Sequence, residues 1–324
     1  MRGAPRGAVM LNFNQLRAFY FAAKHENFTT AAQKLYITQP AVTAQIKLLE
    51  GACNLKLFKK RGRKVYLSDE GKILYPYVRK IFQQEKEIES VIDEMRELKR
   101  GILRLGTTKT YARYFMPLLI TRFRETYPDI KIHLDEGSSQ DMTRSLLDFQ
   151  NEIAIIAKSE DHPDVYFFPF SEEEIVLITA PNHPLAGKTS VPFDEISKEP
   201  IIMKENGSGT RRLVNELFAR HQCAPDMLME TSNTEFIKQL VQRGDGISFL
   251  VKEAVSMELK EGRLAAVSLK GSRIFLDVSI AYLKGQHRSP PAQAFLDMLG
   301  KLAPEEMLPQ GIGALMAKML AQRR

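Results

Sequence analysis

The chain has 324 residues, of which 44% are hydrophobic, and its 46 basic and 39 acidic side chains give a net charge of +7. This length suits two or three packed domains, and the mean hydropathy of −0.24 suits a water-soluble protein. The apolar runs are short and interrupted by charge, and no apolar segment follows the arginines at the N-terminus. We therefore expect no membrane span and a cytoplasmic location. Two distant cysteines and six scattered histidines predict neither a disulfide framework nor a metal site.

The positive charge is concentrated in the first third of the chain. Residues 1–100 carry 19 basic and 10 acidic side chains, a net charge of +9, whereas the remainder carries 27 and 29, a net charge of −2. The excess of basic over acidic side chains lies within residues 1–67, which hold 12 basic and 2 acidic side chains. A small basic module of this kind favours nucleic acid over membrane as its partner, although a solvated basic surface would also explain the charge.

Three short helices are predicted before residue 55. The first is indicated by apolar side chains spaced as one helical face, namely Leu16, Phe19, Tyr20 and Ala23. The second is expected to begin at Thr29 or Thr30, whose hydroxyl can cap free backbone donors. Ala31 and Ala32 then permit a close helix crossing, and Ile37 is expected to fill the turn that follows.

The third helix has the pattern of a recognition helix. Thr38 is a good N-cap, Pro40 is tolerated in the first turn, and the inward stripe is Val42, Ile46 and Leu49. The opposite face carries Gln39, Pro40, Thr43 and Lys47. Short polar and apolar groups at a helix N-terminus can enter a major groove, where Gln pairs with adenine and Thr meets a thymine methyl.

A basic hairpin follows the helices. Five cations surround Gly62 in "KKRGRKVYL", and Val65 and Leu67 then alternate with Tyr66 as a half-buried strand. Cations beside a recognition helix contact phosphates, which set affinity and register more than sequence choice. A solvated run of charge is the alternative. The complete set of expected contacts with double-stranded DNA is Thr30, Thr38, Gln39, Pro40, Thr43, Gln45, Lys47, Arg61, Arg63 and Lys64.

These segments resemble the LysR-type transcriptional regulators. The resemblance covers nearly the whole chain and is strongest in "LRAFYFAAKHENFTTAAQKLYITQPAVTAQIKLLE", "LKLF" and "RGRKVYLSDEG". It implies an α/β protein with an all-α winged helix-turn-helix at the N-terminus, a long linker helix and a two-lobed effector domain similar to periplasmic binding proteins. The chain departs from the family at Cys53 and Asn54, where Leu-Gly is usual, and at Gly51, so the recognition helix is expected to end early or be looser.

On this basis the expected domains are 11–68 for the DNA-binding head, 69–100 for the linker helix and 101–304 for the effector domain. Its first lobe would comprise 101–162 and 269–304, and its second lobe 163–268. The tail, 305–324, has a weak amphipathic pattern to which we assign no function.

The linker helix is predicted to pair with a second copy of itself. Ser68 can cap it, and apolar residues recur at steps of three and four over about 20 residues, which requires a partner helix. A homodimer would also present two recognition helices to two half-sites, and a dimer of dimers is the larger assembly expected. Packing of the stripe on the chain's own effector domain is the alternative. The expected dimer contacts are Leu74, Val78, Ile81, Ile88, Ile92 and Met95.

Strands and helices alternate from residue 102 onward. Strands are expected at "ILRLGTT", "IKIHLDE" and "EIAIIA", with helices over 111–127 and 138–149, and this order implies a parallel sheet covered on both faces. A second such series is expected within 165–269, after which "RIFLDVSIAYL" and a helix near 292–302 return to the first lobe. Two doubly wound lobes leave a cleft between them at the carboxyl ends of their strands.

The loops at those strand ends are rich in hydroxyls and precede helices, where free backbone donors favour an anion. A simple capped turn explains any one such loop equally well, but four that converge favour a small anionic ligand. "GSGTR" adds two glycines and a guanidinium, and within the family it looks most like the branch that senses sulfur compounds or phosphorylated metabolites of carbon fixation. The family's effector contacts map onto Thr107, Thr108, Ser139 and Thr234. The loops themselves add Thr110, Ser208, Thr210 and Arg211.

Two other functions fit part of the sequence. An enzyme that binds a small anion, such as a transferase, would explain the second domain, but no nucleotide-binding or nucleophile motif is present. A stand-alone solute-binding protein would explain the two lobes, but not the basic module in front of them. We therefore expect a regulator and not an enzyme, with no metal or cofactor. The resemblance also admits RNA polymerase as a partner.

Overall fold

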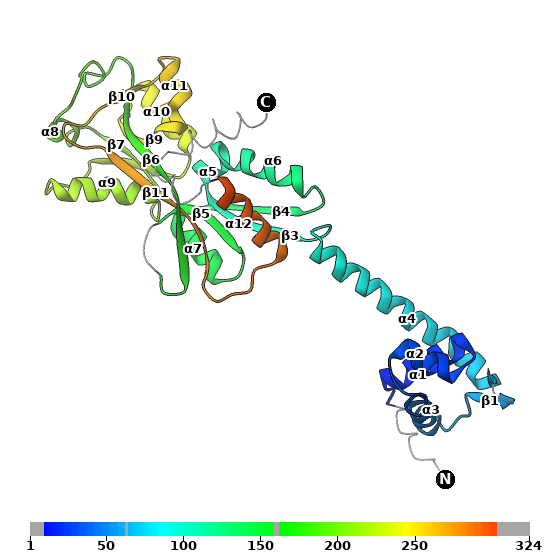
Figure 1. Ribbon diagram of the computed structural model, residues 1–324. Coiled ribbons are helices and arrows are strands. Elements are labelled where there is room, and N and C mark those ends of the chain that lie inside the picture. Colours follow the sequence, from blue (N-terminus) through cyan, green and yellow to red (C-terminus); the bar gives the residue numbers. More distant parts are fainter. Residues whose placement is uncertain (1–9, 62–63, 159–161, 303–324) are drawn as a thin grey trace, which may run out of the picture. The chain divides into compact units, whose positions relative to one another are not determined.

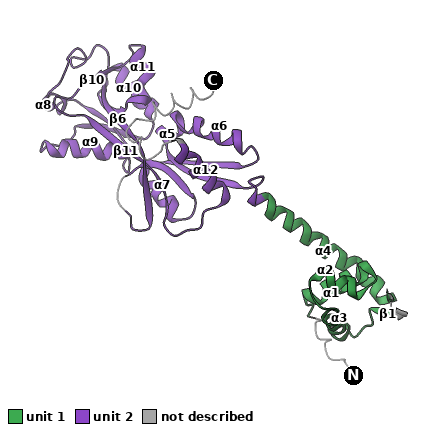
Figure 2. Cartoon of the chain, in the orientation of Figure 1, with its two compact units in different colours: residues 1–94 green, residues 95–324 purple. Residues whose placement is uncertain are grey.

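The computed structural model describes residues 10–61, 64–158 and 162–302. The chain divides into two compact units, residues 1–94 and 95–324 (Figure 2). The first unit is helical with one small hairpin, and the second is a mixed α/β domain (Figure 1). None of the helices in the described ranges is long and apolar enough to cross a membrane.

The first unit is a winged helix-turn-helix. It contains α1 (Phe13–His25), α2 (Phe28–Leu35), α3 (Gln39–Cys53) and the antiparallel strands β1 (Phe58–Arg61) and β2 (Lys64–Leu67). Its core is built from small and apolar side chains on the facing sides of the three helices and on β2, among them Ala18, Ala22, Ala31, Ala32, Val42, Ile46 and Val65.

Local details of these helices differ from expectation. Helix α2 begins at Phe28 because Asn27, which occupies the cap position, accepts hydrogen bonds from the backbone N–H groups of Thr29 and Thr30. Ile37 does not fill the turn but is 42% exposed. Helix α3 continues through Gly51 to Cys53, and Asn54 ends it in the left-handed conformation that a C-cap requires.

The apolar stripe of helix α4 (Asp69–Arg96) is packed against the head in its first part and is exposed farther along. Ser68 accepts a hydrogen bond from the backbone N–H of Gly71, so it caps the helix as predicted. Val78 is fully buried in the head's own core, and Leu74 and Ile81 are packed against it. The prediction of Val78 as a dimer contact is therefore corrected, because packing within the head leaves this side chain inaccessible to a second copy of the chain. Farther along the helix, Ile88, Ile92 and Met95 are 60%, 44% and 46% exposed.

The second unit begins with a parallel sheet. Strand β3 (Ile102–Thr108) lies between β4 (Lys131–Gly137) and β5 (Ile153–Ala157), parallel to both. Side chains alternate along β5, so Ile153 and Ile155 face the helices α6 (Met116–Thr126) and α12 (Pro290–Leu302). Ala154 and Ile156 face α7 (Ser139–Leu147) on the other side. The helix expected over 111–127 is interrupted at Phe115, which leaves α5 (Lys109–Tyr114) as a separate short helix at the end of β3.

Two long strands connect the lobes. β6 (Val165–Thr179) and β11 (Ile274–Leu283) pair antiparallel over most of their length, with a register shift between Val278 and Ser279. β11 also pairs with β5 of the first lobe. At its other end β6 pairs antiparallel with β9 (Ser248–Val251) and β10 (Ala265–Val267) of the second lobe. A seven-stranded sheet thus extends through both lobes.

The second lobe contains β7 (Ile201–Lys204), α9 (Gly209–Arg220), β8 (Met227–Thr231) and α10 (Thr234–Arg243) as expected, with β7 and β8 parallel. The expectation that this series is parallel throughout is wrong, because β6, the strand that enters from the first lobe, runs against its neighbours. The expected series also lacked the short elements α8 (Phe193–Ile196), η1 (Lys252–Val255), α11 (Ser256–Lys260) and β10.

Candidate DNA-binding surface and effector cavity

The N-terminus of α3 presents polar side chains that the fold does not bury. Thr38 accepts a hydrogen bond from the backbone N–H of Ala41 and so caps the helix. Gln39 Nε2 donates to Thr43 Oγ1 over 3.0 Å, and that hydroxyl donates to the Gln39 carbonyl over 3.1 Å. These bonds are within one exposed turn, so the Gln39 amide is oriented by its neighbour and is free to meet another partner.

The other expected DNA contacts are placed less uniformly. Pro40 and Lys47 are exposed, while Thr30 and Gln45 are half-buried. Arg61 ends β1 and Lys64 begins β2, where they pair across the hairpin backbone. Arg63 lies outside the described residues.

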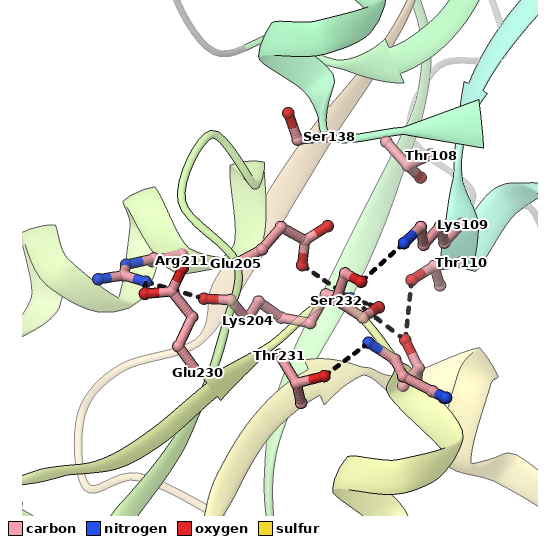
Figure 3. A network of polar contacts seen from close by, with 12 residues as sticks. Thr108, Lys109, Thr110, Ser138, Lys204, Glu205, Arg211, Glu230, Thr231 and Ser232 are labelled. Carbon is pink, nitrogen blue, oxygen red and sulfur yellow. Dashed lines mark hydrogen bonds and ion pairs between the residues drawn. The ribbon is translucent and has the colours of Figure 1, made fainter. Parts of the chain in front are cut away.

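Five of the eight expected effector residues, Thr110 among them, line a small cavity between the lobes of the second unit. Thr108 caps α5, Ser139 opens α7, and Ser208 and Thr210 lie at the start of α9, and all four line the cavity. Its volume is about 20 Å³, which is room for one water molecule. Ser139 is fully buried, and its hydroxyl has no hydrogen-bond partner within the described ranges. Figure 3 shows Thr108 and Ser138 on one side of this site and Lys204 and Glu205 on the other.

The cavity is also lined by a buried cation, Lys204, which sequence reasoning missed. It is 6% exposed, and its ammonium group donates to the Ser232 carbonyl over 2.7 Å and to Thr234 Oγ1 over 3.4 Å. Its third partner is Glu205 Oε2, 3.1 Å away. Burial lowers the pKa of Lys204, and the Glu205 carboxylate opposes that effect. The signal in the sequence was a lysine as the last residue of the apolar strand "PIIMK", at its carboxyl end.

Arg211 does not line this cavity, contrary to expectation. Its guanidinium pairs with Glu230 and donates to the Lys204 carbonyl over 3.2 Å, on the outer side of the loop (Figure 3). The reason is helical rotation, because Thr210 is the buried neighbour and the next side chain along α9 points toward β8. Thr107 is also outside the lining, since its buried hydroxyl donates to the Ile155 carbonyl within the sheet.

Thr110 and Thr234 join the two lobes. Their hydroxyls are 3.3 Å apart, and Lys109 of the first lobe donates to Ser232 Oγ of the second over 2.7 Å. The same residues line a more open neighbouring cavity of about 510 Å³. Direct hydrogen bonds between the lobes therefore border the small cavity at this edge.

A buried ionic cluster lies beyond that edge. Lys238 contacts four groups, namely Glu235 at 2.7 Å, Glu258 at 2.8 Å, the Tyr114 hydroxyl at 3.0 Å and the Ala254 carbonyl at 3.1 Å. Tyr114 belongs to the first lobe and also donates to Glu235 over 2.5 Å. This cluster is a second interlobe contact. No group of three His, Cys, Asp or Glu side chains in the described part of the chain could hold a metal ion.

A helix-turn-helix head followed by a two-lobed domain with a polar cavity defines a ligand-responsive, DNA-binding regulator. Residues 13–72 match the sequence model of the bacterial regulatory helix-turn-helix proteins of the lysR family, and residues 96–304 match that of the LysR substrate binding domain. The chain belongs to the LysR family of bacterial transcriptional regulators. This confirms the predicted family and fold class, and because the family is not enzymatic, the enzyme alternative is excluded.

Known proteins show similarity over most of the chain. The HTH-type transcriptional activator CmpR of Synechocystis sp. is 34% identical over 286 residues, 88% of this chain and 94% of CmpR. The CcmR regulatory domain of Synechocystis PCC6803, solved in complex with 2-PG, is 30% identical with a TM-score of 0.60 and covers 65% of this chain and 100% of that one. A full-length OxyR variant from Pseudomonas aeruginosa shares the fold at 21% identity, with a TM-score of 0.70 over 90% of this chain and 100% of that one.

Proposed function

We propose that this protein is a cytoplasmic, homodimeric regulator that binds operator DNA through α3 and the β1–β2 hairpin. A small anionic effector modulates this binding by entering the interlobe cavity, which has room for one water molecule and must widen to admit it. The observation that carries the effector half is the buried Ser139 hydroxyl, which has no hydrogen-bond partner within the described ranges and faces a cavity also lined by Thr108 and Thr210. Burial of an unpaired hydroxyl costs free energy unless a ligand or a water molecule supplies the missing hydrogen-bond partner.

The anionic character of the effector rests on the direction of the donors. Ser139 is the first residue of α7, a nine-residue helix whose N-terminal N–H groups and dipole favour negative charge. Hydroxyls from both lobes surround that position. The solved complex of the CcmR regulatory domain with 2-PG supports a small ligand in the corresponding domain.

The DNA half rests on the first turn of α3. Gln39, Pro40 and Thr43 form a short polar and apolar surface with no bulky charge, which suits entry into a major groove. Dimerisation rests on Ile88, Ile92 and Met95, because three exposed apolar side chains at steps of four and three along a charged helix require a partner.

The decisive experiment combines fluorescence anisotropy on operator DNA with calorimetric titration of candidate anions. Ser139→Ala removes a hydroxyl that makes no hydrogen bond within the described ranges, so folding should be unaffected while effector affinity falls by about 1 to 3 kcal/mol. Ser197→Ala, which removes an exposed hydroxyl bonded to the Asp194 carbonyl, is the matched control. Unchanged effector affinity in Ser139→Ala would refute the site.

A further inference from the structure

The buried cation of the cavity is paired with a carboxylate. The Lys204 ammonium group has three hydrogens, and Ser232, Thr234 and Glu205 supply three acceptors within 3.4 Å of it. Two of these hydrogens are donated to Ser232 and Thr234, and the Glu205 carboxylate matches the charge as an ion pair without a well-directed hydrogen bond. This pairing leaves the lysine with only a weak electrostatic attraction for an incoming anion.

The arginine of the same loop is neutralised in the same way. Arg211 pairs with Glu230, and that contact holds the pKa of the Glu230 carboxyl below its usual value. Lys109 lies at the rim, where it is exposed and donates to Ser232 Oγ. A dianion such as sulfate or phosphate would therefore enter a site whose buried cation is already paired with a carboxylate, which leaves Lys109 at the rim as a single cation for one negative charge.

Glu205 supplies the opposite chemistry. Its Oε2 atom is buried at the cavity and accepts no well-directed hydrogen bond within the described ranges, although Lys204 is 3.1 Å away. Figure 3 shows the carboxylate directed toward Lys109 and Thr108, on the side of the cavity. A carboxylate is an acceptor only, so a ligand beside it can hydrogen-bond to it only through a donor.

The cavity thus offers donors and an acceptor side by side. Ser139, Thr108 and Thr210 present hydroxyls to an anionic group, and Glu205 presents a carboxylate to a donor. From this arrangement we infer that the effector is a monoanionic hydroxy or amino acid, whose carboxylate meets the hydroxyls and whose hydroxyl or ammonium group meets Glu205. The inference rests on the proposed effector site and narrows its ligand from small anions in general to this class.

The test is calorimetry on the full-length protein with matched ligands. Propionate, lactate, glycerate, alanine and serine share a three-carbon carboxylate and differ in their donors, while inorganic sulfate and phosphate carry charge without a carbon chain. We expect the hydroxy and amino acids to bind about ten- to a hundredfold more tightly than propionate, since a hydrogen bond to a charged acceptor is gained. Sulfate should be the weaker ligand.

The variant Glu205→Gln keeps the shape of the side chain and removes its charge. It should lose most of the preference for hydroxy and amino acids over propionate, and sulfate affinity should rise about tenfold because Lys204 is then unneutralised. Glu195→Gln removes an exposed carboxylate that pairs with Lys188 outside the cavity lining, so it should leave both preferences as they are.

Three outcomes separate the hypotheses. Wild-type protein that binds sulfate or phosphate more tightly than glycerate and serine overturns this inference and leaves the proposed anionic site standing. Equal affinity for propionate and its hydroxylated relatives also overturns the inference. If none of these anions binds and only uncharged compounds change operator binding, the anionic half of the proposed function fails together with it.

Discussion

The recognition helix and the effector cavity are built in opposite ways. The polar side chains at the start of α3 come from one continuous segment, are exposed and hydrogen-bond one another, as Gln39 and Thr43 do. The cavity collects side chains from β3, α7, β7 and α9, with Thr108 and Thr210 about a hundred residues apart in the chain, and buries them. The first surface is exposed before its partner arrives, whereas access to the second depends on the separation of the lobes.

The two sites also differ in how much of their positive charge remains available to a partner. On the head, Gln39 and Lys47 are exposed to solvent and accessible to a polyanion. At the cavity Lys204 is paired with Glu205, and on the outer side of the same loop Arg211 is paired with Glu230, so both of these charges are already matched. Exposed cations give affinity and salt dependence, and a buried neutral site gives selectivity by hydrogen bonding.

The largest expected effect comes from preventing two copies of the chain from pairing through α4. Ile88→Glu combined with Ile92→Glu places like charges on the exposed part of α4, so the dimer should dissociate and operator affinity should fall by about a hundredfold or more as bivalent binding is lost. Sedimentation velocity and anisotropy would measure the two effects. Met257→Glu, an equally exposed apolar position of the effector domain, is the control. A double variant that stays dimeric would contradict the proposed seam.

Next in size is a change that damages the head alone. A methyl group at Gly71 would clash with the backbone carbonyl oxygen of Leu57, so Gly71→Ala should destabilise the first unit by about 3 kcal/mol or more. Scanning calorimetry should then show one transition moved to lower temperature and the transition of the second unit unchanged.

Gly51 provides the control for that experiment. Its added methyl would meet nothing within 4 Å, so Gly51→Ala should stabilise α3 by about 0.5 to 1 kcal/mol. A head that tolerates both substitutions equally would show that the contact at Gly71 is relieved by movement of the loop at Leu57.

A smaller effect sharpens the assignment of roles within the head. Gln39→Ala should cost about 1 to 3 kcal/mol on the operator and little on random DNA, because it removes a contact to a base edge. Lys47→Ala should weaken both complexes alike and reduce the salt slope by about one unit. Anisotropy at several salt concentrations on both DNAs measures this. Parallel losses from the two variants on both DNAs would contradict the distinction.

The smallest effect concerns the helix that carries Ser139. Asp141 accepts hydrogen bonds from the hydroxyl and the backbone N–H of Ser138, which hold the pKa of this carboxyl below its usual value. A carboxyl with a depressed folded-state pKa stabilises the fold above its unfolded-state pKa, and this contribution is lost as the pH falls through the folded-state value, below about 4.

Asp141→Asn should therefore cost about 1 kcal/mol at pH 7 and progressively less below about pH 4, as followed by urea denaturation. Asp148→Asn, at the C-terminal end of the same helix, should be neutral or slightly stabilising because the helix dipole disfavours an anion there. Equal destabilisation by both variants at pH 7 would exclude the capping explanation.

The head could be predicted from the sequence because its determinants are local. The Thr38 cap, the inward stripe of Val42, Ile46 and Leu49 and the Ser68 cap all depend on residues within a few positions of one another. The start of α2 was placed too late because Asn27 lies outside the alanine pattern that marked the helix.

The cavity could be predicted only as a set of loops. Helix caps and strand ends brought Thr108, Ser139, Ser208 and Thr210 to the right place. Which cation faces inward could not be predicted, because the orientation of α9 and the burial of Lys204 depend on contacts with β8 and with Ser232 and Thr234, which are distant in the chain. The antiparallel entry of β6 into the second lobe was missed for the same reason, since strand direction depends on pairing with distant β9 and β10.

The paired strands β6 and β11 give the effector domain a mechanical property. Because both strands continue from one lobe into the other, the lobes cannot separate at a flexible linker and must move by twisting or bending this two-stranded ribbon. The register shift between Val278 and Ser279 interrupts the ladder within the ribbon, and an irregularity of this kind bends and twists a strand locally. A ligand that must open the cavity therefore has to twist or bend this ribbon, and the free energy of that deformation lowers the affinity of the ligand.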